Sequence, residues 1–203
     1  MNLLTTLFGG ATGTVLEAYG KLPFYQDYIA VLSSPEAVAW KGWLLAFAGR
    51  PGIRLPPGRW PFLFRQQRKG PALAGIIEQS SDGIRQFPFS LFVSLAGIRT
   101  GLLPAAAPLA WRLLDRERRE LEKIVSIEEC YSRLRGRQVT IEPVKGTAEP
   151  QLADALDNTE KSSGPLFLIC PQQPVPLPPI PFSGSESLFL ENWFARAAHA
   201  SPG

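Results

Sequence analysis

Cysteine and histidine are almost absent from this chain of 203 residues, which contains Cys130, Cys170 and a single histidine, His199. The two cysteines lie far apart in unlike surroundings. One bridge between them is possible, but the sequence has no disulfide framework and no CxxC metal knuckle, so a reducing compartment is expected. His199 lies close to the end of the chain, where fraying is expected, so it does not predict a Ser-His-Asp or Cys-His centre.

An excess of charge of one sign is also missing. The formal net charge is +3, charged residues make up 19% of the chain, and the two signs are mixed along it. Nucleic-acid binding usually needs a concentrated basic face, so this pattern argues against a nucleic-acid partner.

Long hydrophobic runs are interrupted. The most apolar tract, residues 91–114, contains Arg99 together with glycines and prolines, and it falls short of the roughly 20 unbroken apolar residues that a membrane span needs. The first residues, "MNLLTTLFGGATG", lack the basic start and apolar centre of a signal peptide. The sequence therefore predicts a cytoplasmic protein without membrane insertion.

Catalytic signatures are absent from the sequence as well. It contains no Walker loop, no GxSxG, no HExxH and no glycine-rich dinucleotide motif. Acidic pairs such as Glu128 with Glu129 fall on faces of helices that should be solvated. We therefore expect no enzyme, no catalytic residues, no cofactor and no metal site.

What the chain does have is enough apolar material, 45% of its residues, for one domain of mixed strands and helices. A helix should begin at Pro35 with Ser34 as its N-cap, or one residue earlier with Ser33 and Glu36 as a capping box, and its apolar residues recur at helical spacing from Ala37 to Ala48. The strands predicted in this half are "TVLEAYGKLP" (14–23), the hairpin of "WPFLF" (60–64) and "PALAGIIEQ" (71–79), and "PFSLFVSLA" (88–96), whose alternating side chains suggest a strand covered on both faces.

The second half starts with the strongest helical signal. One stripe of apolar residues runs from Trp111 to Leu134 and predicts a long helix over about 106–136, with opposite charges paired at four-residue spacing on its outer side. Segment 145–164 stays open between a flap with a short helix and a disordered loop. The other elements predicted here are an edge strand in "VTIEPV" (139–144), a buried strand in "PLFLIC" (165–170), a proline-rich strap at 171–182 and a C-terminal helix over about 185–198.

Two polar loops follow apolar strands, in "YGKLPFYQDY" (19–28) and "SSDGIRQFP" (80–88). Lys21 and Asp27 could meet across the first loop, and Asp82 should organise the second as an Asx turn. Arg85 could then reach Asp82 or Asp27 as a bidentate donor. Our hypothesis is that both loops lie together at one end of the sheet. A separate turn is basic and contains Arg65, Arg68 and Lys69. It is better explained as a solvated hairpin tip than as a phosphate clamp.

These two loops carry a family resemblance. Together with the tryptophan-bearing helix between them, they resemble the TagF (ImpM) accessory proteins of bacterial type VI secretion systems. The resemblance covers roughly residues 14–100, with Gln26 in place of the family's glycine, Tyr28 in place of its phenylalanine, and one residue fewer between Asp82 and Phe87. The first element is matched by Tyr19, Gly20, Lys21, Leu22, Pro23 and Asp27, and the second by Gly75, Ser80, Asp82, Arg85, Phe87 and Pro88. We take all of these except Gly75, together with Ser81, as candidate structural or partner-binding residues.

The resemblance implies a single α/β domain, a three-layer α/β/α sandwich with a mixed central sheet and no catalytic activity. It implies a post-translational regulator, a repressor of type VI secretion that acts by protein contacts, with a forkhead-associated scaffold protein as the expected partner. Two alternatives stay open from the residues themselves: a general α/β scaffold or adaptor of another envelope assembly, and a hydrolase or ligand-binding enzyme using Ser81, Asp82 and Arg85.

Overall fold

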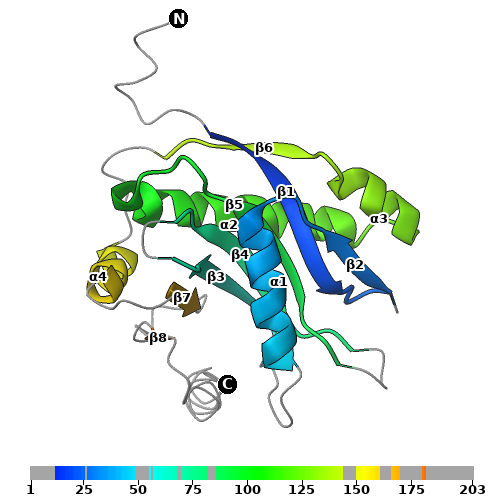
Figure 1. Ribbon diagram of the computed structural model, residues 1–203. Coiled ribbons are helices and arrows are strands. Elements are labelled where there is room, and N and C mark those ends of the chain that lie inside the picture. Colours follow the sequence, from blue (N-terminus) through cyan, green and yellow to red (C-terminus); the bar gives the residue numbers. More distant parts are fainter. Residues whose placement is uncertain are drawn as a thin grey trace, which may run out of the picture.

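The computed structural model places one sheet through the molecule, with helices on either side of it (Figure 1). The helices and strands are β1 (Thr12–Lys21), β2 (Tyr28–Val31), α1 (Pro35–Ala48), β3 (Arg59–Arg65), β4 (Leu73–Glu78), β5 (Phe89–Ser94), the 3-10 turn η2 (Thr100–Leu102), α2 (Leu103–Leu121), α3 (Ile127–Leu134), β6 (Gln138–Ile141), α4 (Pro150–Glu160), β7 (Leu166–Ile169) and β8 (Ile180–Pro181). The residues that the structure describes are 12–25, 27–48, 55, 57–67, 70–81, 86–143, 150–160, 166–169 and 180–181.

The strands of this part of the chain follow the order β2–β1–β5–β4–β3–β7–β8, and β6 pairs with the first residues of β1. Every pairing among them is antiparallel. The expected mixed sheet is therefore wrong for these strands. The connections give the reason: β1 to β2 and β3 to β4 are joined by loops too short for the crossover that a parallel pair requires.

The predicted strand at 14–23 and the predicted hairpin are confirmed as β1 and as β3 with β4. Phe62 of β3 pairs with Gly75 of β4, and a Cβ on Gly75 would lie 2.3 Å from the ring of Phe62. Glycine at this position therefore leaves the space that the Phe62 ring occupies.

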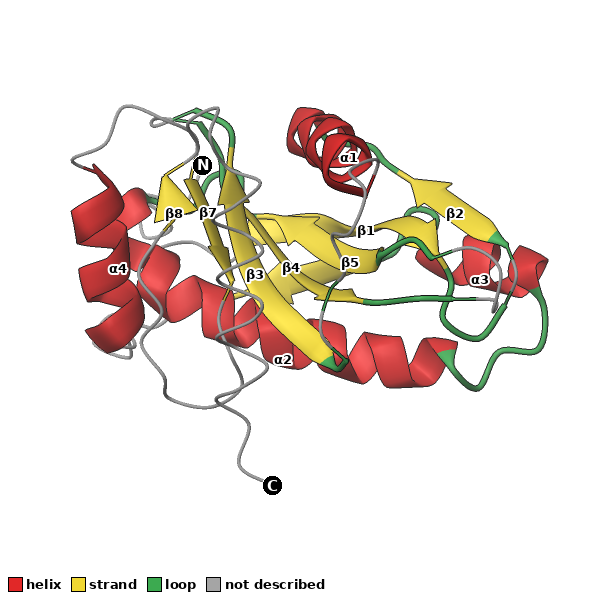
Figure 2. Cartoon of the chain, turned by 90° about the horizontal axis from the view of Figure 1, so that it is seen from below, coloured by secondary structure: helices red, strands yellow, loops and turns green. Residues whose placement is uncertain are grey.

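Strand β5 lies inside the sheet with both faces buried, as its alternating pattern predicts. Leu91 and Val93 belong to a core cluster with α2 residues such as Leu114, whereas Phe92 belongs to a second cluster with α1 residues such as Trp40. Figure 2 shows the same division, with the sheet between α1 on one side and α2 on the other. The alternation of β5 therefore supplies side chains to two separate cores.

Helix α1 begins as predicted, because the Ser34 hydroxyl accepts a hydrogen bond from the backbone N–H of Ala37 at 3.2 Å. The same end is held by Glu17 of β1, a buried residue. Its carboxylate accepts bonds from the backbone N–H and the hydroxyl of both Ser33 and Ser34. A carboxylate at a helix N-terminus also interacts favourably with the helix dipole, so β1 fixes where α1 starts.

The helical spacing of the apolar residues of α1 does not coincide with their burial. Trp40 and Leu44 are fully buried, but Val38 is 60% exposed and Leu45 is 46% exposed. Apolar residues surround the whole helix, so their spacing does not distinguish the face that packs on the sheet from the face that does not.

The predicted long helix over 106–136 is in fact two helices, α2 and α3. The break lies at residues 122–126, and Ser126 starts α3 by accepting a hydrogen bond from the backbone N–H of Glu129 at 3.2 Å. Val125, expected in the apolar stripe, is 85% exposed in this break. The helical periodicity continues across residues 122–126, which is why the sequence did not indicate the N-cap inside it.

Helix α3 is tied back to α2 by buried charge. Glu117 of α2 is 3% exposed, and its carboxylate accepts hydrogen bonds from Arg137 at 3.1 Å and from Arg133 at 3.5 Å. The predicted edge strand (β6) and the apolar strand at 165–170 (β7) are present. Segment 145–164, which the sequence left open, contains the helix α4. The strap at 171–182 lies outside the described residues except for β8, and the C-terminal helix over about 185–198 lies outside them entirely.

Candidate functional site

The two loops singled out in the sequence lie side by side at one end of the sheet. Gly20, near the end of β1, pairs with Phe89, at the start of β5. Gly20 has a φ of 123°, and a Cβ on it would lie 2.0 Å from the carbonyl oxygen of Pro88. A residue with a side chain would be both strained and obstructed here, so glycine allows the two segments to approach this closely.

A buried serine joins the loops directly. The hydroxyl of Ser80, 2% exposed, donates a hydrogen bond to the backbone carbonyl of Leu22 at 3.1 Å. The carbonyl of Ser80 also accepts a bond from the N–H of Phe87 at 3.1 Å, and Ser81 forms an isolated β-bridge with Gln86. The ends of the second loop are therefore held together at their base, and Ser80 has a structural role.

Aromatic rings extend this contact over the first loop. The ring of Phe87 lies 6.0 Å from that of Tyr19, edge to face, and 5.4 Å from that of Tyr28. Burial raises the pKa of the Tyr19 hydroxyl, with a smaller contribution from Tyr28. Tyr19 therefore stays neutral at physiological pH and packs as an aromatic residue.

Lys21 lies inside the first loop and is fully buried. Its Nζ donates to the backbone carbonyl of Tyr25 at 3.3 Å, while the backbone N–H of Leu22 donates to the carbonyl of Asp27 at 3.0 Å. Asp27 is exposed and Pro23 is half-buried. Lys21 thus lies where it organises the loop, and Asp27 lies where another molecule can reach it.

Asp82 and Arg85 lie outside the described residues, together with Gln26. The expected bidentate contact of Arg85 with Asp82 or Asp27 therefore stays a prediction.

The basic turn is different, because Arg65 is only 3% exposed at the end of β3. Its expected place on a solvated hairpin tip is wrong, since the strand continues through it and pairs it with Leu166 of β7.

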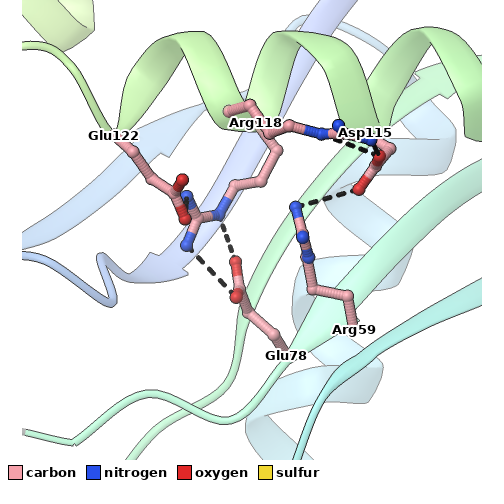
Figure 3. Close-up of polar contacts among 6 residues, drawn as sticks. Arg59, Glu78, Asp115, Arg118 and Glu122 are labelled. Carbon is pink, nitrogen blue, oxygen red and sulfur yellow. Dashed lines mark hydrogen bonds and ion pairs between the residues drawn. The ribbon is translucent and has the colours of Figure 1, made fainter.

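An ion pair that the sequence did not indicate lies close to these loops. Arg118 of α2, 3% exposed, reaches Glu78 at the end of β4 with two nitrogens of its guanidinium group (Figure 3). The guanidinium also lies 4.9 Å from the ring centre of Phe24 in the first loop and 5.8 Å from that of Phe89. Arg118 therefore joins α2, the sheet and the first loop in one buried contact.

The pairing of Arg118 with Glu122 was expected on a solvated surface, and the ion pair is present at 2.9 Å. The burial of Arg118 was not expected. Its position between charged neighbours in "DRERRE" gave no sign of it, and only the acidic end of the otherwise apolar β4, at Glu78, hinted at a partner.

The described residues of these loops bring a few polar and aromatic side chains to the surface. Among the described residues, no group of three or more His, Cys, Asp or Glu side chains could hold a metal ion. None of the helices in the same part of the chain has the length and apolar character needed to cross a bilayer. What the loops do present is exposed Asp27, Tyr28 and Ser81 beside half-buried Phe87.

Comparison with known proteins gives a likeness of fold. No protein-family model and no curated protein matches the chain. The solved structure of PA0076 from Pseudomonas aeruginosa PAO1 is similar, with a TM-score of 0.51 and 15% identity over 93% of this chain and 96% of that one. At this identity the match concerns the fold alone. It supports a mixed α/β fold over most of the chain.

Proposed function

We propose that this chain is a non-enzymatic cytoplasmic accessory protein of a bacterial type VI secretion system, of the TagF (ImpM) type. It regulates the assembly or activity of the apparatus, as a repressor, by binding other proteins. In keeping with that family, we also propose that the helices on the two sides of the sheet make a three-layer α/β/α sandwich.

One observation carries this proposal. The two elements that resemble the family are separated by roughly sixty residues, yet Ser80 of the second is hydrogen-bonded to Leu22 of the first, and Gly20 lies against Pro88. Elements that form one structural unit are more informative than two separate sequence matches. The exposed side chains at this unit suit a protein partner, and a forkhead-associated scaffold protein is the partner that the resemblance suggests.

The test is an affinity pull-down of the tagged protein from its native host, followed by mass spectrometry. We expect a forkhead-associated protein or other secretion components to be retained. Deleting the gene should increase secretion by the apparatus, because a repressor is lost.

A charge reversal at the second loop localises the contact. Arg85→Glu should reduce capture of the partner by about tenfold or more, since like charges that face each other across an interface cost several kcal/mol. Arg99→Glu is the matched control, because Arg99 is exposed beyond the other end of β5. A folded protein that retains no secretion component would contradict the proposal and favour a general scaffold. Hydrolysis of a test ester that depends on Ser81 would favour the enzyme alternative.

A further inference from the structure

Two adjacent side chains of the first loop are held by the segment in which α2 ends and α3 begins. The hydroxyl of Tyr25 donates a hydrogen bond to the backbone carbonyl of Ile124 at 2.5 Å. The ring centre of Phe24 lies 4.9 Å from the guanidinium carbon of Arg118. Both contacts come from the half of the chain that the family resemblance does not cover.

The break between α2 and α3 makes the first of these contacts possible. In a continuous α-helix the carbonyl of Ile124 would accept the backbone N–H of Glu128, four positions later. In this chain α2 has already ended, and α3 begins at Ile127 with Ser126 as its N-cap. The Ile124 carbonyl is therefore available to the hydroxyl of Tyr25.

Packing of the apolar stripe does not explain the break. The helical period continues through residues 122–126, so a continuous helix would keep Val125 in the stripe, whereas Val125 is 85% exposed in the structure. Departures from what the local sequence favours are expected at functional sites. What the break provides is the contact between Ile124 and the first loop.

The second contact depends on a fixed cation. Arg118 is 3% exposed, reaches Glu78 with two nitrogens (Figure 3) and pairs with Glu122 at 2.9 Å. A guanidinium group that is held by carboxylates on two elements offers a planar cation to an aromatic ring. Because Arg118 is buried, it acts on the surface of the molecule only through Phe24.

We propose that Arg118 and Tyr25 are positioning residues, which hold the first loop in the conformation that it presents to a protein partner. Within the loop, the N–H of Leu22 donates to the carbonyl of Asp27 at 3.0 Å, and the N–H of Tyr25 donates to the carbonyl of Leu22 at 3.4 Å. A loop that is already held loses less conformational freedom on binding. The role in recognition rests on the proposed function, whereas the hold on the loop does not.

Amide hydrogen exchange measures the hold on the loop without any partner. Tyr25→Phe removes only the hydroxyl, and Phe24→Leu removes only the ring. Each should speed exchange of the amides of residues 22 and 25 by about threefold to tenfold, because a hydrogen bond or a cation–π contact is lost. Tyr131→Phe is the matched control. It removes a hydroxyl that accepts the N–H of Ala30 outside the loop, so the two amides should exchange as before.

Arg118→Lys tests the effect on recognition in the pull-down. It keeps a positive charge beside Glu78, but a compact ammonium group lacks the planar face that lies against the ring of Phe24. Capture of the partner should fall by about threefold or more, and exchange of the two loop amides should rise with it. Arg119→Lys, at a neighbouring position that is 63% exposed, should change neither.

Loop amides that exchange at the unmodified rate in the double variant Phe24→Leu/Tyr25→Phe would overturn the proposal. Faster exchange in Arg118→Lys with full capture of the partner would also overturn it, since recognition would then not need the held conformation. If the unmodified chain captured no secretion component, the proposed function would be contradicted instead. The exchange of the loop amides would still decide whether Arg118 and Tyr25 hold the loop.

Discussion

On its α1 face the sheet presents most of its aromatic rings and the hydroxyl of Ser90, whereas aliphatic side chains predominate on its α2 face. Trp40 of α1 lies between Trp43 and Phe62, with ring centres at 5.0 Å and 4.2 Å, and its Nε1 donates to the hydroxyl of Ser90 at 3.0 Å. On the other face, Leu114 and a run of alanines in α2 pack on Ile76 and its neighbours. One face therefore depends on a few large side chains, and the other on many small contacts.

The outer sides of α1 and α2, which face away from the sheet, also differ in polarity. Helix α2 is covered by charged residues that suit water, while α1 exposes Val38 and Leu45. The sequence of α2 is strongly amphipathic, so its outer side is polar and solvated. The sequence of α1 is not, so some of its apolar side chains are exposed to solvent. The following predictions test how far this contrast between the faces extends.

The largest effect is expected from Trp40→Ala. It removes a fully buried ring together with its stacking and its hydrogen bond, and it should lower the free energy of unfolding by about 3–5 kcal/mol. The matched change on the other face, Leu114→Ala, should cost about 2–3 kcal/mol, because the alanines around it share the packing. Urea denaturation measures both. An equal or larger loss for Leu114→Ala would mean that the two faces do not differ in this way.

Arg118→Ala tests the buried charge on the α2 face. It leaves the Glu78 carboxylate largely buried without its partner and should cost about 3 kcal/mol. The double variant Arg118→Met/Glu78→Met should recover most of this loss, since it removes both charges. Arg119→Ala, one residue further along and 63% exposed, should have no measurable effect. If the double variant were no more stable than Arg118→Ala, the cost would come from packing and not from charge.

Glu17→Gln tests the polar link on the α1 face. The amide keeps the shape of the side chain but loses the charge that accepts four hydrogen bonds at the start of α1, so we expect a loss of about 1–2 kcal/mol. Hydrogen exchange should report faster opening of α1 while α2 keeps its protection. Equal loss of protection in both helices would show that the two faces open together.

The smallest effect on stability is expected from ionisation of the Cys130 thiol as the pH is raised. Cys130 belongs to the core on the α2 face. Burial raises the pKa of its thiol, and Glu129 adds to the shift. The folded chain therefore holds the proton at a pH where the unfolded chain releases it, and this contribution to stability is lost as the pH rises above the ordinary thiol value. In a Cys170→Ser variant, a thiol reagent near neutral pH should react slowly until the protein is unfolded. Rapid labelling of the folded variant would show that this core opens readily.

Local patterns were sufficient to predict much of the fold. Ser34 followed by Pro35 marked the start of α1, and the alternation of β5 assigned Leu91 and Phe92 to opposite faces, as the structure has them. The N-cap at Ser126 was not predicted, because the apolar period continues across the break between α2 and α3. Of the candidate site, the closeness of the two loops was expected, whereas the burial of Lys21 and Arg118 was not.

The difference between the features that the sequence predicted and those that it did not has a physical reason. Turn residues, capping residues and the period of apolar side chains act over a few positions, so the order of strands and helices and the two polar loops can be inferred along the chain. Whether a charged residue is buried depends on which distant segment supplies its partner, as Glu78 does for Arg118 across forty positions. The contacts of the Phe87 ring with Tyr19 and Tyr28 likewise exist only after β1 has paired with β2 and β5.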